Sequence, residues 1–599
     1  MDRNTIIAIV LTVIVITVGM TIQTAFFSPE VSETAQTETV TDVSAEIQTP
    51  STSSYSYTAV AQGSDANPFV ASTDAMSVTF DPKGASVSSI VLNNEGSSGE
   101  NLDILIKDSS GKNAFLMYPS TDFNTPITDV FNYTVEKKSV NRTVNNVNQS
   151  IEMTVVSFSQ KFKVASSDQV FTINKSFALP SSKEYMMQLA ITISSDDGSA
   201  LPISFYTLGY DPQVGPSFTS LSGNYDYRRM YYKRADKGGK NTVSFKNNTY
   251  STSETLDWAA LAGKYFAIIA IPQSGVNYET TFVQKENSSG ISQSDSFYLT
   301  RQGVNGSSVT DVYSFYTGPK VTSYLNMYDL EKDNAFSLSG LKLNKVMDTS
   351  AWLGWLETIL KWCLTLFYKV IPNYGVAIIL LTFLIKLLLQ PLSKKGMDST
   401  AKMSALGPKM DELKKKYADD PQAMNAAMAK LYKEEGINPM GSCLPMLIQF
   451  PILIAFYGLL NNHYELRGAM FIPGWIPDLS IPETIFTLPF SIPFLGSQIH
   501  LLPIIYTVSM ILSMKITQTA STQNSQQGMM NFMTYGMPII FFFVLYNAPS
   551  GLLVYWTTMN MISTVQQIYV NKKKKKKFEA EIQSKEDAKI AKFQKRKKK

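Results

Sequence analysis

The distribution of apolar residues along the chain constrains its fold more than any other feature. Residues 30–345 of the 599-residue chain are polar and rich in Ser, Thr, Asn and Tyr, whereas residues 350–570 hold nearly all the long apolar runs. A helix of about 20 apolar residues crosses the roughly 30 Å hydrocarbon core of a bilayer. The sequence therefore predicts a polar domain followed by an α-helical polytopic membrane domain.

An apolar run also precedes the polar domain. Residues 5–27 carry no charge and are long enough for one span. A cleaved signal peptide would have a shorter run and a small-residue cleavage site, and the sequence shows neither. We expect residues 1–27 to form an N-terminal transmembrane signal anchor, and residues 28–54, which are poor in apolar side chains, to form a disordered linker.

Short alternating strands are predicted throughout residues 55–345. The segments MSVTFDPKGASVSSIVL, KFKVASSDQVFTINKSFAL and YMMQLAITISS have the period of half-buried antiparallel strands. We expect a large extracytoplasmic β-sandwich. Large sandwiches include sugar-binding and epimerising enzymes, but their catalysis generally needs a histidine or paired acids, and the two histidines, His463 and His500, lie outside this domain. A structural or docking role is favoured, and the chain is expected not to be an enzyme.

Residues 346–570 are predicted to form the membrane core. Five spans beyond the anchor, six transmembrane helices in all, are expected at residues 371–392, 440–461, 499–516, 529–547 and 550–569. The connection 393–438 carries nine lysines, whereas the loop 462–500 carries none. By the positive-inside rule the first is cytoplasmic and the second is outside. Both termini are then cytoplasmic, and the β-sandwich is extracytoplasmic.

Three segments flank these spans. Six apolar residues after Asp348 are predicted to share one face of a helix in the membrane interface, with an ordinary core helix as the alternative: Trp352, Trp355, Leu356, Ile359, Trp362 and Phe367. Residues 393–438 predict a helical hairpin in which Asp420 caps the second helix, and its methionines either bind varied partners or pack the helices together. The basic tail, residues 571–599, suits anionic lipid or RNA, or is solvated and only enforces topology.

One cation lies inside a predicted span. Lys386 shares a helical face with Thr382 and Gln390, each four residues away. A charge in lipid costs several kcal/mol unless it is compensated. An ion-coupled transporter would place carboxylates in its spans, but the other predicted spans of this chain hold none. Polar side chains of the other spans are expected to line a wet groove around it: Gln449, Ser509, Ser513, Thr557, Asn560, Thr564 and Gln567. Snorkelling of Lys386 to the inner interface is the alternative.

Several motifs resemble the YidC-type membrane protein insertases of the YidC/Oxa/Alb family. They are LTFLIKLLLQPLS, LYKEEGINPMGSCLPMLIQFPILIAFY, DLS and PSGLLVYW, within residues 352–569. The resemblance implies a hydrophilic groove whose cation stands at Lys386, where the family usually has arginine, and a substrate-contacting position at Thr382. The family's Tyr-Tyr pair corresponds to Tyr555 and Trp556. The loop 481–497 is longer than the family leads us to expect.

The resemblance also implies a function. The chain would insert and fold inner-membrane proteins, alone or with the Sec translocon, without a cofactor. Its expected partners are nascent membrane proteins, membrane lipids, and the ribosome through the hairpin and the basic tail; no DNA is expected.

Two other functions would leave different features in the sequence. A channel or transporter with a solute-binding outer domain would show paired repeats or intramembrane acids, and the sequence shows neither. A membrane-anchored carbohydrate enzyme would need catalytic acids or a histidine on the outside, and it would not explain five spans with polar stripes.

Overall fold

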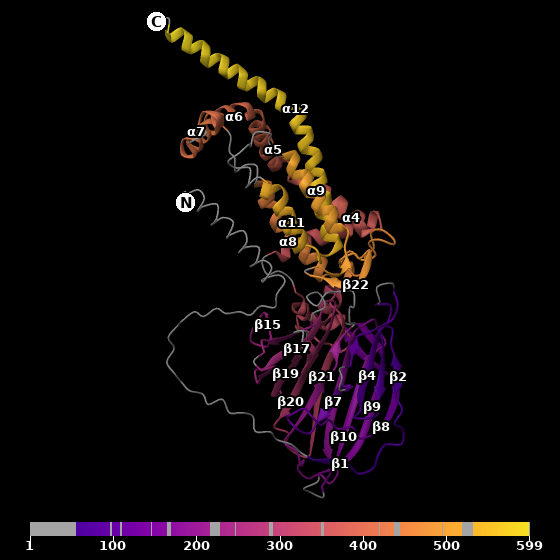
Figure 1. The fold of residues 1–599 in the computed structure, drawn as a ribbon. Coiled ribbons are helices and arrows are strands. Elements are labelled where there is room, and N and C mark those ends of the chain that lie inside the picture. Colours follow the sequence, from indigo (N-terminus) through magenta and orange to yellow (C-terminus); the bar gives the residue numbers. More distant parts are fainter. Residues whose placement is uncertain are drawn as a thin grey trace. The chain divides into compact units, whose positions relative to one another are not determined.

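A computed structural model describes residues 56–597 of the chain with twelve gaps. The gaps are residues 96–98, 108–110, 145–146, 165–168, 216–227, 246, 287–291, 349–352, 418–419, 437–443, 494 and 518–530. The predicted signal anchor and linker lie outside the described residues. The chain divides into two compact units, residues 1–346 and 347–599 (Figure 1).

The first unit contains two large antiparallel sheets. One has ten strands in the order β1-β9-β10-β11-β21-β18-β17-β14-β15, with β8 beside β9. Its strands are β1 (Tyr57–Ala59), β8 (Asn132–Val144), β9 (Val147–Val164), β10 (Val170–Pro180), β11 (Met186–Ser195), β14 (Arg228–Arg234), β15 (Lys240–Thr242), β17 (Leu256–Gly263), β18 (Phe266–Ile271) and β21 (Ser308–Pro319).

The second sheet has nine strands in the order β16-β19-β20-β12-β7-β4-β3-β2, with β5 beside β4. Its strands are β2 (Phe69–Ser72), β3 (Met76–Asp81), β4 (Ser86–Leu92), β5 (Leu102–Asp103), β7 (Ala114–Tyr118), β12 (Phe205–Tyr210), β16 (Thr249–Thr252), β19 (Tyr278–Glu286) and β20 (Ser292–Gln302). Smaller elements complete the unit: β6 (Leu105–Ile106) paired with β13 (Gln213–Val214), α2 (Thr322–Asn326), η1 (Met327–Asp329), η2 (Glu331–Asp333) and η3 (Leu343–Val346).

Aromatic side chains pack the two sheets against each other. Phe80 of β3 lies 5.1 Å, between ring centroids, from Phe177 of β10, and Phe115 of β7 lies 4.5 Å from Phe315 of β21. Each pair joins one sheet to the other, and all four side chains are buried. The predicted β-sandwich is therefore confirmed, and the alternating segments quoted above form β3 with β4, β9 with β10, and β11.

A lysine interrupts this apolar core. Lys175 of β10 is fully buried, and its ammonium donates hydrogen bonds to the carbonyls of Gly84 (3.2 Å), Ala85 (2.6 Å) and Phe115 (2.6 Å). All three acceptor residues have positive φ, of 69°, 47° and 62° respectively. A Cβ at position 84 would lie 2.5 Å from the Ile127 carbonyl oxygen, so only glycine fits there.

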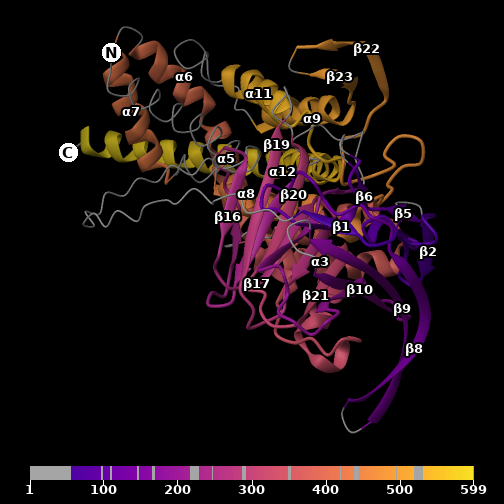
Figure 2. The ribbon, with the colours of Figure 1, turned by 90° about the horizontal axis from the view of Figure 1, so that it is seen from below.

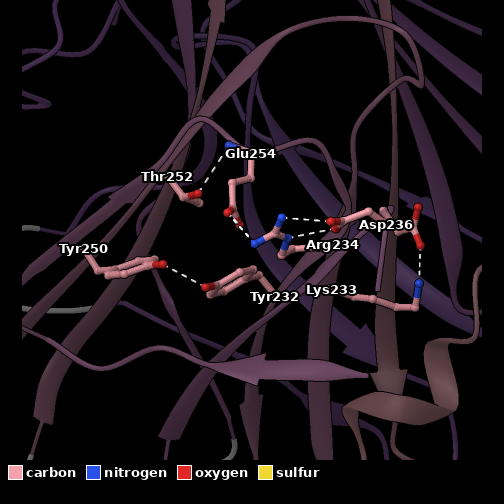
Figure 3. A network of polar contacts seen from close by, with 8 residues as sticks. Tyr232, Lys233, Arg234, Asp236, Tyr250, Thr252 and Glu254 are labelled. Carbon is pink, nitrogen blue, oxygen red and sulfur yellow. Dashed lines mark hydrogen bonds and ion pairs between the residues drawn. The ribbon is translucent and has the colours of Figure 1, made fainter. Parts of the chain in front are cut away.

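A polar network joins the sheets at one edge (Figure 3). Arg234 of β14 donates to Asp236 at 2.8 and 2.9 Å and pairs with Glu254 at 2.5 Å. Next to it, the hydroxyl groups of Tyr232 and Tyr250 lie 2.8 Å apart. Because β14 and β16 belong to different sheets, the tyrosine pair links the two sheets directly.

The second unit is helical. Its elements are α3 (Gly354–Val370), α4 (Tyr374–Leu388), α5 (Gln390–Ala405), α6 (Gly407–Lys416), α7 (Pro421–Glu434), α8 (Leu444–Asn462), η5 (Tyr464–Leu466), β22 (Phe486–Ile492), β23 (Gly496–Ile499), α9 (Leu502–Thr517), η6 (Phe532–Gly536), α11 (Met537–Val544) and α12 (Ser550–Lys597). Its apolar core is built by α3, α4, α8, α9 and α12, with Leu360, Ile378, Phe456, Tyr506 and Leu553 as one buried contributor from each.

The predicted spans overlap with α4, α8, α9, α11 and the first part of α12. Within the described parts of the chain, no helix is both long enough and apolar enough to qualify as a membrane span. The six transmembrane helices therefore stay a prediction.

Helix α3 exposes three of the six residues of the predicted apolar face. Trp355 and Trp362 are 64% and 66% exposed, and Ile359 lies between them on the same side. Leu356 and Phe367 instead pack partly against the core. These two residues therefore do not share one face with Trp355, as was predicted, because at 100° per residue they lie about 100° or more away from it. Trp352 lies outside the described residues.

The connection after α4 forms three helices, α5, α6 and α7, where a two-helix hairpin was expected. Asp420 caps α7 as predicted, since its carboxylate accepts hydrogen bonds from the backbone N–H groups of Gln422 and Ala423. Met410 of α6 is buried, and Met428 of α7 packs against it. For these two methionines the structure favours packing of the helices over a free partner-binding surface.

Candidate substrate-binding site

Lys386 lies near the C-terminal end of α4, a helix that begins after the N-cap Asn373. The side chain is nearly buried, at 7% exposure. Its ammonium donates a hydrogen bond of 2.7 Å to the hydroxyl of Ser563 on α12. An ammonium carries three N–H donors, so one hydroxyl leaves most of its hydrogen-bonding capacity for other groups.

The two predicted neighbours of Lys386 differ from each other. Thr382 is fully buried, and its hydroxyl donates to the Ile378 carbonyl of the preceding turn at 2.7 Å. Gln390 is exposed, and it is the first residue of α5, since α4 has already ended at Leu388. The three residues therefore do not lie on one continuous helix. Pro391 explains the break, since it has no N–H with which to continue α4.

Helices α9 and α12 bring a second group of predicted residues together. The Asn560 amide of α12 lies 3.5 Å from the Ser509 hydroxyl of α9. Ser509 in turn donates to the Tyr506 carbonyl at 2.7 Å. Ser513, one turn further along α9, is half-buried.

The predicted aromatic pair lies at the start of α12. Tyr555 is fully buried, with its ring centroid 4.8 Å from that of Phe456 on α8. The half-buried Gln449 of α8 lies close to the Tyr555 hydroxyl. Trp556 is half-buried and packs near the rings of Tyr506 and Phe541, at 5.1 and 5.5 Å. The pair therefore contributes packing between helices, with Gln449 as its polar neighbour.

Ser563 is the contact that the sequence analysis missed. It follows Asn560 by three residues and precedes Thr564, so it belongs to the polar stripe that was predicted on this helix. The Thr564 hydroxyl is taken up by its own helix, donating to the Asn560 carbonyl at 2.7 Å. The helical spacing alone could have included Ser563, although it could not show which hydroxyl meets Lys386.

Charged residues also meet where α3 approaches η5. Lys361 of α3 pairs with Glu465 at 2.7 Å, and His463 lies 3.9 Å from the same carboxylate. Burial lowers the pKa of His463 to about 4, and the nearby Lys361 adds to this shift. His463 is therefore neutral at physiological pH. Among the described residues, no group of three or more His, Cys, Asp or Glu side chains is arranged to hold a metal ion.

Two family models match the chain. The model of the YidC periplasmic domain covers residues 69–363, and that of the 60Kd inner membrane protein covers residues 366–577. Together they include nearly all of the described β-sandwich and the helical unit up to the basic tail.

Relatives with curated names cover the chain as well. The membrane protein insertase YidC of Treponema denticola is 34% identical over 594 residues, which is 96% of this chain and 100% of the relative. The insertase YidC of Treponema pallidum is 40% identical over 370 residues, 61% of this chain and 58% of the relative. A crystal structure of an active YidC insertase aligns with 86% of this chain and 95% of its own, at 17% identity and a TM-score of 0.35. On the sequence relationship, this chain belongs to the YidC family of membrane protein insertases.

Proposed function

We propose that this chain inserts and folds proteins in the inner membrane, and that a polar track receives the segment to be translocated. The polar track consists of Lys386 on α4, Ser563 and Asn560 on α12, and Ser509 on α9. The observation that carries the proposal is the hydrogen bond between Lys386 and Ser563, which holds a cation at a nearly buried position.

The charge of Lys386 would supply the attraction. Within the described part of the chain, its ammonium is hydrogen-bonded to a neutral hydroxyl. A hydroxyl compensates only part of the cost of burying a charge, and Coulomb attraction strengthens as the local dielectric constant falls. An acidic or polar segment of a nascent protein would therefore be stabilised beside Lys386, which shortens the distance that it still has to cross.

Apolar surface beside the track would then release the substrate into lipid. Phe383, Leu387 and Leu388 of α4 are more than half exposed and lie close to Lys386 in the chain. A hydrophobic segment that follows the polar one would partition along such a surface, driven by the transfer of apolar area out of water. This sequence of events requires no covalent step.

We also propose the orientation that charge dictates. The distribution of lysines would place the β-sandwich outside the membrane and α5–α7 and the basic tail in the cytoplasm, with six spans between them. The basic tail and α5–α7 would meet the arriving chain or the ribosome, and cooperation with the Sec translocon is compatible with the same track.

Reconstituted insertion tests the role of Lys386. The purified full-length protein in liposomes receives a single-span substrate with an acidic outer segment, and protease protection of that segment is measured. We expect Lys386→Arg to retain insertion and Lys386→Ala to reduce it about tenfold or more, because losing about 1.4 kcal/mol of stabilisation lowers a rate about tenfold.

Two controls sharpen this test. Ser563→Ala keeps the cation and should reduce insertion less than Lys386→Ala. A substrate whose outer acids are replaced by amides should lose most of the difference between wild type and Lys386→Ala. Equal insertion by Lys386→Ala and wild type would contradict the role of the charge, and no insertion by wild type would contradict the proposed function for the protein acting alone.

A further inference from the structure

The extended loop after α8 contains an apolar β-hairpin, formed by β22 and β23. Figure 2 shows these strands as a separate two-stranded arm beside α9. Ile485, Phe486 and Phe490 are 49%, 53% and 61% exposed. An isolated two-stranded hairpin is only marginally stable in water, and soluble surfaces rarely gather exposed aromatic side chains in this way.

Large apolar side chains recur at every second position along β22. Phe486, Leu488 and Phe490 alternate along β22 with Thr487, Pro489 and Ser491. At the open end of the hairpin the pairing with β23 keeps this division, because Phe486 is opposite Ile499 and Thr487 is opposite Gln498. The register then shifts between Thr487 and Ile492, and Ile492 is opposite Gly496. We call Phe486, Leu488, Phe490 and Ile499 the hairpin face.

The chain around the hairpin face carries no charge. From residue 484 to residue 514 the sequence contains no Asp, Glu, Lys or Arg. Immediately after β23, α9 exposes Ile504, Val508 and Leu512, which are spaced four residues apart on one side of the helix. The exposed apolar surface therefore continues along the chain from the hairpin onto a helix of the membrane core.

Buried polar contacts fix the base of the hairpin. The Glu483 carboxylate accepts a hydrogen bond from the backbone N–H of Leu502 at the start of α9, and the His500 ring donates to the Glu483 carbonyl. The Tyr546 hydroxyl donates to the Gln498 carbonyl at 3.0 Å and accepts a hydrogen bond from the backbone N–H of His500 at 3.3 Å. The hairpin is thereby held against the start of α9 and the end of α11, as a fixed arm.

We propose that the hairpin face lies in the lipid interface of the membrane, where it fixes the depth of the outer end of α9 in the bilayer. Lipid is the occupant that the surface fits. A protein interface usually surrounds its apolar centre with a polar, charged rim, which this segment lacks, whereas Phe and Ile side chains partition readily into the headgroup and acyl boundary. The membrane location follows from the family, and only the choice of the outer leaflet rests on the proposed orientation.

Fluorescence quenching at single sites tests the proposal. In full-length protein with Cys363→Ser and Cys443→Ala, an environment-sensitive probe is attached to Phe490→Cys, or to the neighbouring Ser491→Cys on the opposite face as a matched control. The protein is reconstituted in vesicles of phosphatidylcholine and phosphatidylglycerol without substrate. We expect the probe at position 490 to be quenched by spin-labelled acyl chains at least twice as strongly as at position 491, and iodide to quench in the reverse order.

A second measurement avoids the cysteine changes and distinguishes the occupants. A diazirine amino acid at position 490 of the otherwise unchanged chain should form lipid adducts on illumination, seen by mass spectrometry. Adducts to protein, including this chain's own β-sandwich, or equal quenching at positions 490 and 491, would overturn the proposal. Because no substrate is present, lipid contact can be found even if the insertion assay fails, so the two proposals fail separately.

Discussion

Lys175 places a charge between the two sheets of the sandwich, where desolvation is costly. Three carbonyls compensate for part of this cost. They come from the turn before β4 and from β7, at residues whose φ is positive. In its protonated form the side chain therefore does two things: it satisfies three buried acceptors, and it holds the positive-φ residues Gly84, Ala85 and Phe115 in place.

Removal of this ammonium should destabilise the β-sandwich. Lys175→Met keeps the length of the side chain but leaves the three carbonyls without their donor, so we expect a loss of about 3 kcal/mol in the free energy of unfolding. Hydrogen exchange of β10 in the full-length protein measures the loss. Lys163→Met, an exposed change on β9, should have little effect, and comparable exchange in the two variants would contradict the prediction.

The pH dependence of stability should report the burial of the Lys175 amine. Burial lowers the pKa of Lys175 from 10.5 to about 7. Between these values the unfolded chain holds a proton that the folded chain has lost, so this residue makes the free energy of unfolding rise with pH across that window. Lys175→Met removes the titrating group. Urea unfolding at about pH 7.5 and about pH 9 should therefore show a difference between wild type and variant that grows with pH. A difference that is constant or shrinks would contradict this.

At the scale of elements, single residues determine where a helix begins or ends, whereas the composition of a whole segment determines whether a helix continues. Asp420 begins α7, and Pro391 separates α5 from α4. In contrast, α12 continues without a break from its apolar start into the basic tail, because Lys, Glu, Ala and Gln are all good helix formers. Ile582, deep in the tail, packs against the buried residues Leu406 and Met410.

The cap of α7 offers a test at this scale. Asp420→Ala removes the acceptor for two backbone N–H groups, and we expect the helix to lose about 1 kcal/mol. Asp420→Asn keeps a side-chain oxygen and should restore most of it. Hydrogen exchange in the first turn of α7 distinguishes the variants; equal protection in Asp420→Ala and wild type would show that packing against α6 alone holds the helix.

At the scale of the whole molecule, the two units are stabilised by different means. The β-sandwich buries aromatic side chains between sheets whose strands are far apart in sequence. The helical unit gathers its buried core from α3, α4, α8, α9 and α12, while many large apolar side chains stay exposed on their other sides. Exposed apolar surface of this kind promotes aggregation in water but packs favourably against lipid, in keeping with the insertase family to which the chain belongs.

The sequence by itself determined the features that depend on near neighbours. Strand alternation predicted the β-sandwich, an aspartate before a proline predicted the start of α7, and motif resemblance predicted the family. These signals are local, because side-chain periodicity and capping act within a few residues.

Only the tertiary structure decided how the isolated polar groups are compensated. Alternation along β10 puts Lys175 on the buried face, but its acceptors lie 60 to 91 residues away. Likewise, Lys386 meets a hydroxyl 177 residues later in the chain, and the base of the hairpin is tied to α9 and to Tyr546. Such contacts depend on which segments fold next to each other, and no periodicity within a single segment carries that information.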